Sequence, residues 1–254
     1  MKFLLFLLSI TSLQAEPLRK VLVLIIASDN MPIFLETQKV WRSYMHSDPE
    51  HIEAYFIRGD PTMTTPYRID KDVIWAKSPE NYGLPILKKT IGAFEAMMPR
   101  LHEFDYVLRT NLASFIVFPR LLKTLETLPR TQCYYGANTG GTSVIASGSG
   151  FVLSRDLVEM VVKDKITVLN MRIDPPSDDV ILGYYFRRNK IYRTPGERID
   201  LLCLDDWFHL RPDIPPDVFH FRIKTEDHLR IPHDLYIHGE LLKIFYDINS
   251  QWFP

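Results

Sequence analysis

In the first part of the chain, segments with the hydrophobic pattern of a strand alternate with one that has the pattern of a helix. The continuous aliphatic run over residues 21–28 has the length of a strand, and its lack of polar interruptions predicts a central parallel strand covered on both faces. Residues 32–44 carry apolar side chains at helical spacing after Pro32, and residues 51–57 return to strand-like composition. This order of strand, helix and strand predicts a βαβ unit.

Further along, the clearest amphipathic helix covers residues 85–101, and its apolar stripe is typical of core packing rather than of a cofactor site. Residues 104–118 predict two apolar strands separated by the polar break Arg109-Thr110-Asn111. Shorter patterns predict strands over residues 72–75, 133–135 and 151–153, a helix over 120–128, glycine-rich loops over 137–142 and 147–150, and a helix from residue 156 with Ser154 as N-cap. The chain therefore belongs to the α/β class.

The N-terminus has the features of a secretory signal peptide. Met1-Lys2 gives a basic start, residues 3–10 are apolar, and Ala15 is a small residue before cleavage. The expected division is a signal peptide over 1–15 and a mature domain over 16–254, on the secretory route: the ER or Golgi lumen, the periplasm or the cell exterior. Because the apolar run is short for a bilayer, we expect no stable membrane span, with a retained signal anchor as the alternative.

Composition narrows the classes of function. The formal net charge is −1 and the basic residues are scattered, so a nucleic-acid partner is not expected. The two cysteines, Cys133 and Cys203, could pair in an oxidising compartment or remain as two buried thiols. Nucleotide-binding glycine fingerprints, H-E-x-x-H and structural zinc spacings are absent from the sequence. The Gly148-Ser149-Gly150 segment precedes its apolar strand, whereas the nucleophile elbow of a serine hydrolase follows one.

Two polar clusters are candidates for a site. Ligands of open α/β sheets bind at the carboxyl ends of strands, so Arg109 and Asn111 are placed to contact one, although a simple turn with a solvated Arg109 would give the same pattern. Asp178 and Asp179 open a helical segment after a proline-rich entry. Acidic residues are also common at helix starts because they interact favourably with the helix dipole.

Four segments occur in a fixed order along the chain: 81–90 with Lys89, 106–111, 147–154, and 178–183 with the acidic pair. Together they resemble the β-1,3-galactosyltransferase and fringe type of glycosyltransferase, over about residues 72–190. The resemblance implies a single GT-A-like (Rossmann-like) domain with a mostly parallel sheet flanked by helices. It also implies a nucleotide-sugar donor, a UDP-sugar in particular, and inverting transfer to the hydroxyl of a glycan or glycoprotein acceptor.

The resemblance further implies roles for individual residues. Asp179 matches the general base, with Asp178 as second choice, because a sugar hydroxyl needs a carboxylate to take its proton. The expected donor contacts come from strand ends, the 85–101 helix and the serine-glycine segment: Ala27, Ser28, Arg58, Lys89, Arg109, Asn111, Ser147, Gly148, Ser149 and Gly150.

The chain departs from this family at the motif that binds the metal ion. Where the family has an acidic D-x-D motif, this sequence has Asn111, Leu112 and Ala113. An asparagine carbonyl can bind Mn²⁺ or Mg²⁺ without contributing charge, which leaves weak metal binding, metal-free catalysis with Arg109 or Lys89 on the phosphates, or no sugar transfer. His220 matches the last family ligand, although a histidine among aromatic residues is also typical of a packed core.

The expected function is therefore an inverting glycosyltransferase. A catalytically inactive module of the same fold that binds a nucleotide sugar or a glycan is the main alternative, and it would keep Asn111 and the serine-glycine segment without needing Asp179. A hydrolase is the third and more distant candidate for the function.

Overall fold

The computed structural model describes residues 20–139, 142–225 and 230–249. Within them, eight strands form a main sheet in the order β3-β4-β2-β1-β5-β8-β7-β9. These strands are β1 (Val21–Ile26), β2 (Ile52–Gly59), β3 (Tyr67–Asp70), β4 (Val73–Ala76), β5 (Tyr106–Asn111), β7 (Tyr134–Thr139), β8 (Thr142–Ser154) and β9 (Arg193–Pro195). Four of the seven neighbouring pairs are parallel, including β2–β1 and β1–β5 at the centre.

Strand β1 lies at the centre because its side chains are apolar in both directions. Val21, Val23 and Ile25 enter the core on one face of the sheet, and Leu22 and Leu24 enter a second core on the other. The prediction of a central parallel strand covered on both faces is confirmed.

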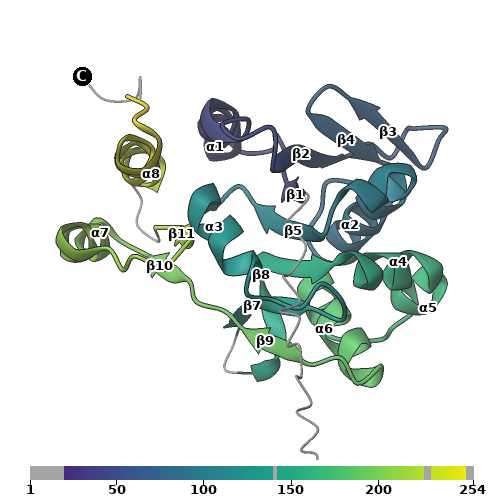
Figure 1. The fold of residues 1–254 in the computed structure, drawn as a ribbon. Helices are drawn as coiled ribbons and strands as arrows, with labels where there is room; N and C mark the ends of the chain where they lie inside the picture. The colour runs from purple at the N-terminus through teal and green to yellow at the C-terminus, as the bar shows by residue number, and fades with distance from the viewer. Residues whose placement is uncertain (1–19, 140–141, 226–229, 250–254) are drawn as a thin grey trace, which may run out of the picture.

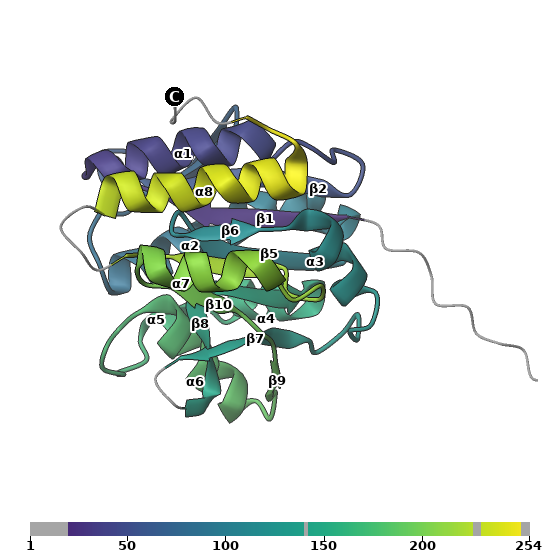
Figure 2. The same cartoon turned by 90° about the vertical axis from the view of Figure 1, so that its left-hand side faces the viewer.

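Helices cover both faces of the main sheet, as Figures 1 and 2 show. One face packs against α1 (Pro32–Tyr44), α3 (Phe118–Leu125), α7 (Leu204–Leu210) and α8 (Arg230–Tyr246). The other face packs against α2 (Leu84–Met97), α4 (Arg155–Lys163), α5 (Lys165–Leu169) and α6 (Asp178–Arg188). The expected α/β domain, with a mostly parallel sheet flanked by helices, is therefore confirmed.

A second, three-stranded sheet stands beside the main one in the described part of the chain, in the order β10-β11-β6. It consists of β6 (Ser114–Ile116), β10 (Ile199–Leu201) and β11 (His220–Ile223). Only two residues separate β5 from β6, so the two sheets meet at the carboxyl end of β5. The register places Asp200 beside Arg222, and Arg222 beside Ser114.

Three local predictions differ from the structure. Helix α2 ends at Met97 and continues as a 3₁₀ helix, Met98–Glu103, at a proline. The segments predicted as glycine-rich loops lie largely within the paired strands β7 and β8, where the neighbouring strand approaches closely: an added Cβ at Gly136 would lie 3.0 Å from the Ala146 Cβ. Strand β3 was not predicted, because it is four residues long and its alternation of apolar and polar residues is too short to stand out; all four residues are exposed.

The two cysteines are unpaired. Cys133 is buried and Cys203 is exposed, so neither the disulfide nor the expectation of two buried thiols is correct. Burial raises the pKa of the Cys133 thiol to about 12. Among the described residues, no helix combines the length and apolar character that a membrane crossing requires. The predicted signal peptide over residues 1–15 lies outside the described residues.

Candidate functional site

A cavity of about 600 Å³ opens where β1 and β5 end, between the two sheets. Ile26 and Asn111, the last residues of these adjacent parallel strands, lie in its wall, which is where α/β sheets bind ligands. The complete lining is Ile26, Tyr82, Ile86, Arg109, Asn111, Asn138, Ser147, Gly148, Ser149, Ser177, Asp178, Asp179, Arg198, Asp200 and Arg222. Each of the four segments that carry the family resemblance contributes at least one residue.

Asp179 presents a fixed carboxylate to this cavity. Its Oδ2 accepts a hydrogen bond from the Gly148 amide at 2.8 Å. Its Oδ1 accepts hydrogen bonds from the Ser177 hydroxyl at 2.6 Å and the Val180 amide at 3.0 Å. The side chain is half-buried in the first turn of α6. The start of this helix and strand β8 therefore hold the carboxylate in one orientation.

Asp178, one residue earlier, has a different environment. It is 2% exposed, its Oδ2 lies 2.6 Å from Arg109 Nη2, and the same oxygen accepts a hydrogen bond from the Thr90 hydroxyl at 2.8 Å. Burial raises the pKa of Asp178, and the positive charge of Arg109 opposes that rise. Asp178 therefore ties α6 to β5 and α2.

Arg109 is equally enclosed, at 2% exposure, so the alternative of a turn with a solvated Arg109 is wrong. Besides its ion pair with Asp178, its Nη1 donates a hydrogen bond to the Gly148 carbonyl. The guanidinium lines the cavity while its charge is already matched by a carboxylate. Its role as a donor contact stays a prediction.

Lys89 lies behind the cavity wall rather than in it. Its Nζ donates hydrogen bonds to the Ala27 carbonyl at 3.2 Å and to Glu80 Oε2 at 2.6 Å. Burial lowers the pKa of Lys89, and the carboxylate of Glu80 raises it. Lys89 and Ala27 therefore form part of the support of the site, outside the described lining.

Arg58 and Ser28 also lie outside the described lining of the cavity. Arg58 forms an ion pair with Asp29, and its guanidinium carbon lies 5.0 Å from the centre of the Trp75 ring. The Ser28 hydroxyl donates a hydrogen bond to Asn30 Oδ1 at 2.5 Å. Their assignment as donor contacts stays a prediction.

The serine-glycine segment of β8 forms one wall. Ser147, Gly148 and Ser149 line the cavity, and their backbone is anchored by Asn111 Nδ2, which donates to the Gly148 carbonyl at 3.1 Å. Gly150 does not line it. A Cβ at Gly150 would lie 2.6 Å from His220 Cε1, so this glycine leaves room for the histidine ring.

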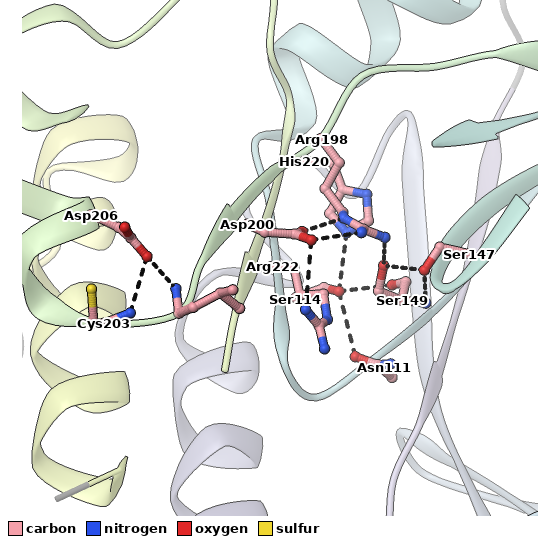
Figure 3. A network of polar contacts seen from close by, with 11 residues as sticks. Asn111, Ser114, Ser147, Ser149, Arg198, Asp200, Cys203, Asp206, His220 and Arg222 are labelled. Carbon is pink, nitrogen blue, oxygen red and sulfur yellow. Dashed lines mark hydrogen bonds and ion pairs between the residues drawn. The ribbon is translucent and has the colours of Figure 1, made fainter. Parts of the chain in front are cut away.

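The residues at the D-x-D position do not fit a divalent cation. Asn111 Oδ1 already accepts a hydrogen bond from the Ala113 amide at 3.0 Å, and it lies 3.4 Å from the Ser114 hydroxyl, which donates its proton to the Ser149 carbonyl at 2.7 Å. His220 Nε2 lies 3.1 Å from the same hydroxyl, and burial lowers the pKa of His220 to about 3 (Figure 3). Across the described ranges, no group of three or more His, Cys, Asp and Glu side chains could hold a metal. The assignment of Asn111 and His220 as ligands of Mn²⁺ or Mg²⁺ therefore stays a prediction without support from this geometry.

The wall next to the serine-glycine segment carries charged residues that were not predicted. Arg198 Nε and Nη2 donate to the two oxygens of Asp200 at 2.5 and 2.8 Å, and Arg198 Nη1 donates to the Ser149 hydroxyl at 2.6 Å. Arg222 Nη1 lies 3.6 Å from Asp200 Oδ2 (Figure 3). The one signal in the sequence was Arg222, a polar position between two apolar residues of a short strand.

The fold is similar to that of a glycosyltransferase. A crystal structure of a glycosyltransferase involved in the glycosylation of the major capsid of PBCV-1 matches with a TM-score of 0.54 and 11% sequence identity. The match covers 86% of this chain and 98% of that one. No family model matches the sequence, and no curated protein does. At this identity the likeness concerns the fold alone.

Proposed function

We propose that this protein is an inverting glycosyltransferase that moves a sugar from a nucleotide-sugar donor, a UDP-sugar in particular, to a hydroxyl of a glycan or glycoprotein acceptor. The observation that carries the proposal is the oriented carboxylate of Asp179 in the wall of a cavity of about 600 Å³. The similarity of the fold to a glycosyltransferase supports it. The presence at this cavity of all four segments that resemble the β-1,3-galactosyltransferase and fringe type is further support.

Asp179 has the capacity to act as a general base. A carboxylate offers about four acceptor positions, and donors of the chain occupy three of them here. The remaining position is available to an acceptor hydroxyl. As that hydroxyl oxygen forms its bond to the anomeric carbon, its proton passes to Asp179, and the bond from carbon to the phosphate oxygen breaks with its electron pair on the leaving nucleotide diphosphate. One carboxylate suffices for this single displacement.

The second candidate is a binding module of the same fold. Two of the three hydrogen bonds to Asp179 satisfy backbone amides, at the start of α6 and in β8, and the third comes from the Ser177 hydroxyl, so they would be explained without catalysis. In that case the serine-glycine wall and Asn111 bind a sugar that is not transferred.

The deciding experiment measures binding and turnover of a panel of nucleotide sugars with the purified mature chain. Release of nucleotide diphosphate together with a glycosylated acceptor, lost in Asp179→Asn, would exclude the binding module. Binding of a donor with no transfer to any acceptor, unchanged in Asp179→Asn, would favour the module instead.

Export on the secretory route belongs to the same proposal. Intact-mass measurement of protein recovered from the secretory compartment is expected to give an N-terminus near Glu16. Recovery of the full-length chain alone, embedded in a membrane, would favour the signal anchor.

A further inference from the structure

We propose that Arg198 and Arg222 form the subsite for the diphosphate of the donor, and that they bind it without a divalent cation. This inference rests on the proposed function and deepens it. Both arginines line the cavity, and both come from the part of the chain that follows the segments of the family resemblance.

The second sheet explains why these charges face the cavity. Side chains alternate along β11, so Phe221 and Ile223 are fully buried in the apolar core while Arg222 points to the other side. The parallel register with β10 places Asp200 directly beside Arg222. Arg198 immediately precedes β10 and donates a hydrogen bond to the same carboxylate.

The distribution of charge separates this wall from the rest of the site. Arg109 is matched by Asp178, and Lys89 by Glu80. Arg198 and Arg222, by contrast, share a single carboxylate, that of Asp200, as ion-pair partner within the described residues. This wall therefore has an excess of positive charge, and the base candidate Asp179 supplies negative charge elsewhere in the same cavity. An anionic group of a ligand is attracted to the arginines, which leaves Asp179 for the acceptor hydroxyl.

The arginines also have suitable geometry. The planar Arg198 guanidinium donates to Asp200 and Ser149 through three of its five N–H groups, which leaves two for a ligand, and its side chain is 11% exposed. Arg222 is more open, with a side-chain exposure of 26%. A planar guanidinium binds phosphate oxygens through paired, charge-assisted hydrogen bonds, and such donors stabilise charge that develops on a leaving diphosphate. The arginines thus supply the positive charge that the residues at the D-x-D position are not equipped to hold.

The test measures binding of uridine diphosphate and of inorganic pyrophosphate to the mature protein in EDTA by calorimetry. We expect the wild-type protein to bind both, and Arg198→Ala and Arg222→Ala each to weaken binding by at least about tenfold. Arg42→Ala is the matched control, because Arg42 also pairs with an aspartate, Asp72, but lies outside the cavity lining. Its affinity is expected to equal that of the wild type.

Asp200→Asn gives a second readout of opposite sign. Removing the carboxylate that competes with the ligand is expected to tighten pyrophosphate binding several-fold, an effect that local unfolding would not produce. This variant decides the question even if the alanine variants fail to fold. Weaker binding in Asp200→Asn, unchanged binding in both arginine variants, or a requirement for Mn²⁺ in the wild type would overturn the proposal. Turnover is read separately, so a protein that binds pyrophosphate through these arginines but transfers no sugar would refute the enzymatic function alone.

Discussion

Arg109 Nη2 and Asp178 Oδ2 lie 2.6 Å apart in an ion pair whose side chains are only 3% and 2% exposed. Removing one partner leaves an uncompensated buried charge or an unfilled polar site, so Asp178→Ala is expected to lower the free energy of unfolding by about 3–5 kcal/mol. Urea unfolding measures this change. The control is Asp72→Ala, which removes the partner of the exposed Arg42 and is expected to cost at most about 1 kcal/mol. Equal effects of the two substitutions would show that the buried pair has no special role in stability.

Asp179→Asn is expected to leave folding and donor binding nearly unchanged and to lower turnover by at least about 10²-fold, the usual scale for a lost general base. Asp205→Asn is the matched control, because Asp205 also lies in the first turn of a helix but outside the cavity lining. It is expected to retain wild-type turnover. Near-normal turnover in Asp179→Asn would remove this carboxylate from the mechanism.

Gly148→Ala tests whether the position of the Asp179 carboxylate matters. An added Cβ would lie 2.9 Å from Asp179 Oδ2, so the carboxylate has to move. We expect a loss of turnover of about 10–100-fold with an unchanged unfolding midpoint. Because the effect acts through Asp179, the double variant with Asp179→Asn is expected to be no slower than Asp179→Asn alone. Additive losses would indicate that Gly148 acts on the substrate directly.

Removal of divalent cations with EDTA tests whether the positive charge at the donor comes from a metal ion or from arginine side chains. We expect turnover in EDTA to stay within about threefold of the untreated value, because the donor set at Asn111 and His220 does not fit a hard divalent cation. Arg109→Ala is expected to impair donor binding more than Asn111→Ala does, since both lose a hydrogen bond to the Gly148 carbonyl but only Arg109→Ala also breaks the buried ion pair with Asp178. Complete loss of turnover in EDTA, restored by Mn²⁺, would make Asn111 and His220 ligands.

The buried side chain of His238 is expected to make the stability of the protein depend on pH. Within the described structure neither ring nitrogen has a hydrogen-bond partner, and burial lowers the pKa of His238 to about 3. The unfolded chain has a pKa of about 6.5 at this residue, so between pH 6.5 and 3 it binds a proton that the folded protein does not. The stability contribution is therefore complete above pH 6.5 and is lost as the pH falls through this window. At pH 5 the cost is about 2 kcal/mol.

His238→Leu is expected to reduce the loss of unfolding free energy between pH 7 and pH 5 by about that 2 kcal/mol, as measured by urea unfolding at both values. His46→Leu serves as the control, because the ring of His46 is exposed to solvent. The same pH dependence in both variants would show that His238 is protonated in the folded state.

Local patterns predicted the elements that hold the site better than they predicted the site. The aliphatic run of β1 and the acidic start of α6 were visible because each depends on neighbouring residues. The contrast between Asp178 and Asp179 was not, because the angle at which α6 meets β8 determines which carboxylate is buried. Arg198 and Arg222 were missed for a related reason: β11 reaches the cavity by pairing with β6, more than a hundred residues earlier, and no local pattern encodes that pairing.

Because β11 comes late in the chain but pairs with the early strand β6, the site is assembled in a defined order during translation. The ribosome delivers β1, β5, β8 and the start of α6 first, and these elements already include Asp179. The strand that carries Arg222 emerges after all of these, and α8, whose Phe245 ring packs against Phe221 of that strand, follows it. A nascent chain therefore has the Asp179 carboxylate before it has Arg198 and Arg222. The proposed diphosphate subsite is therefore acquired only after β11 has been synthesised.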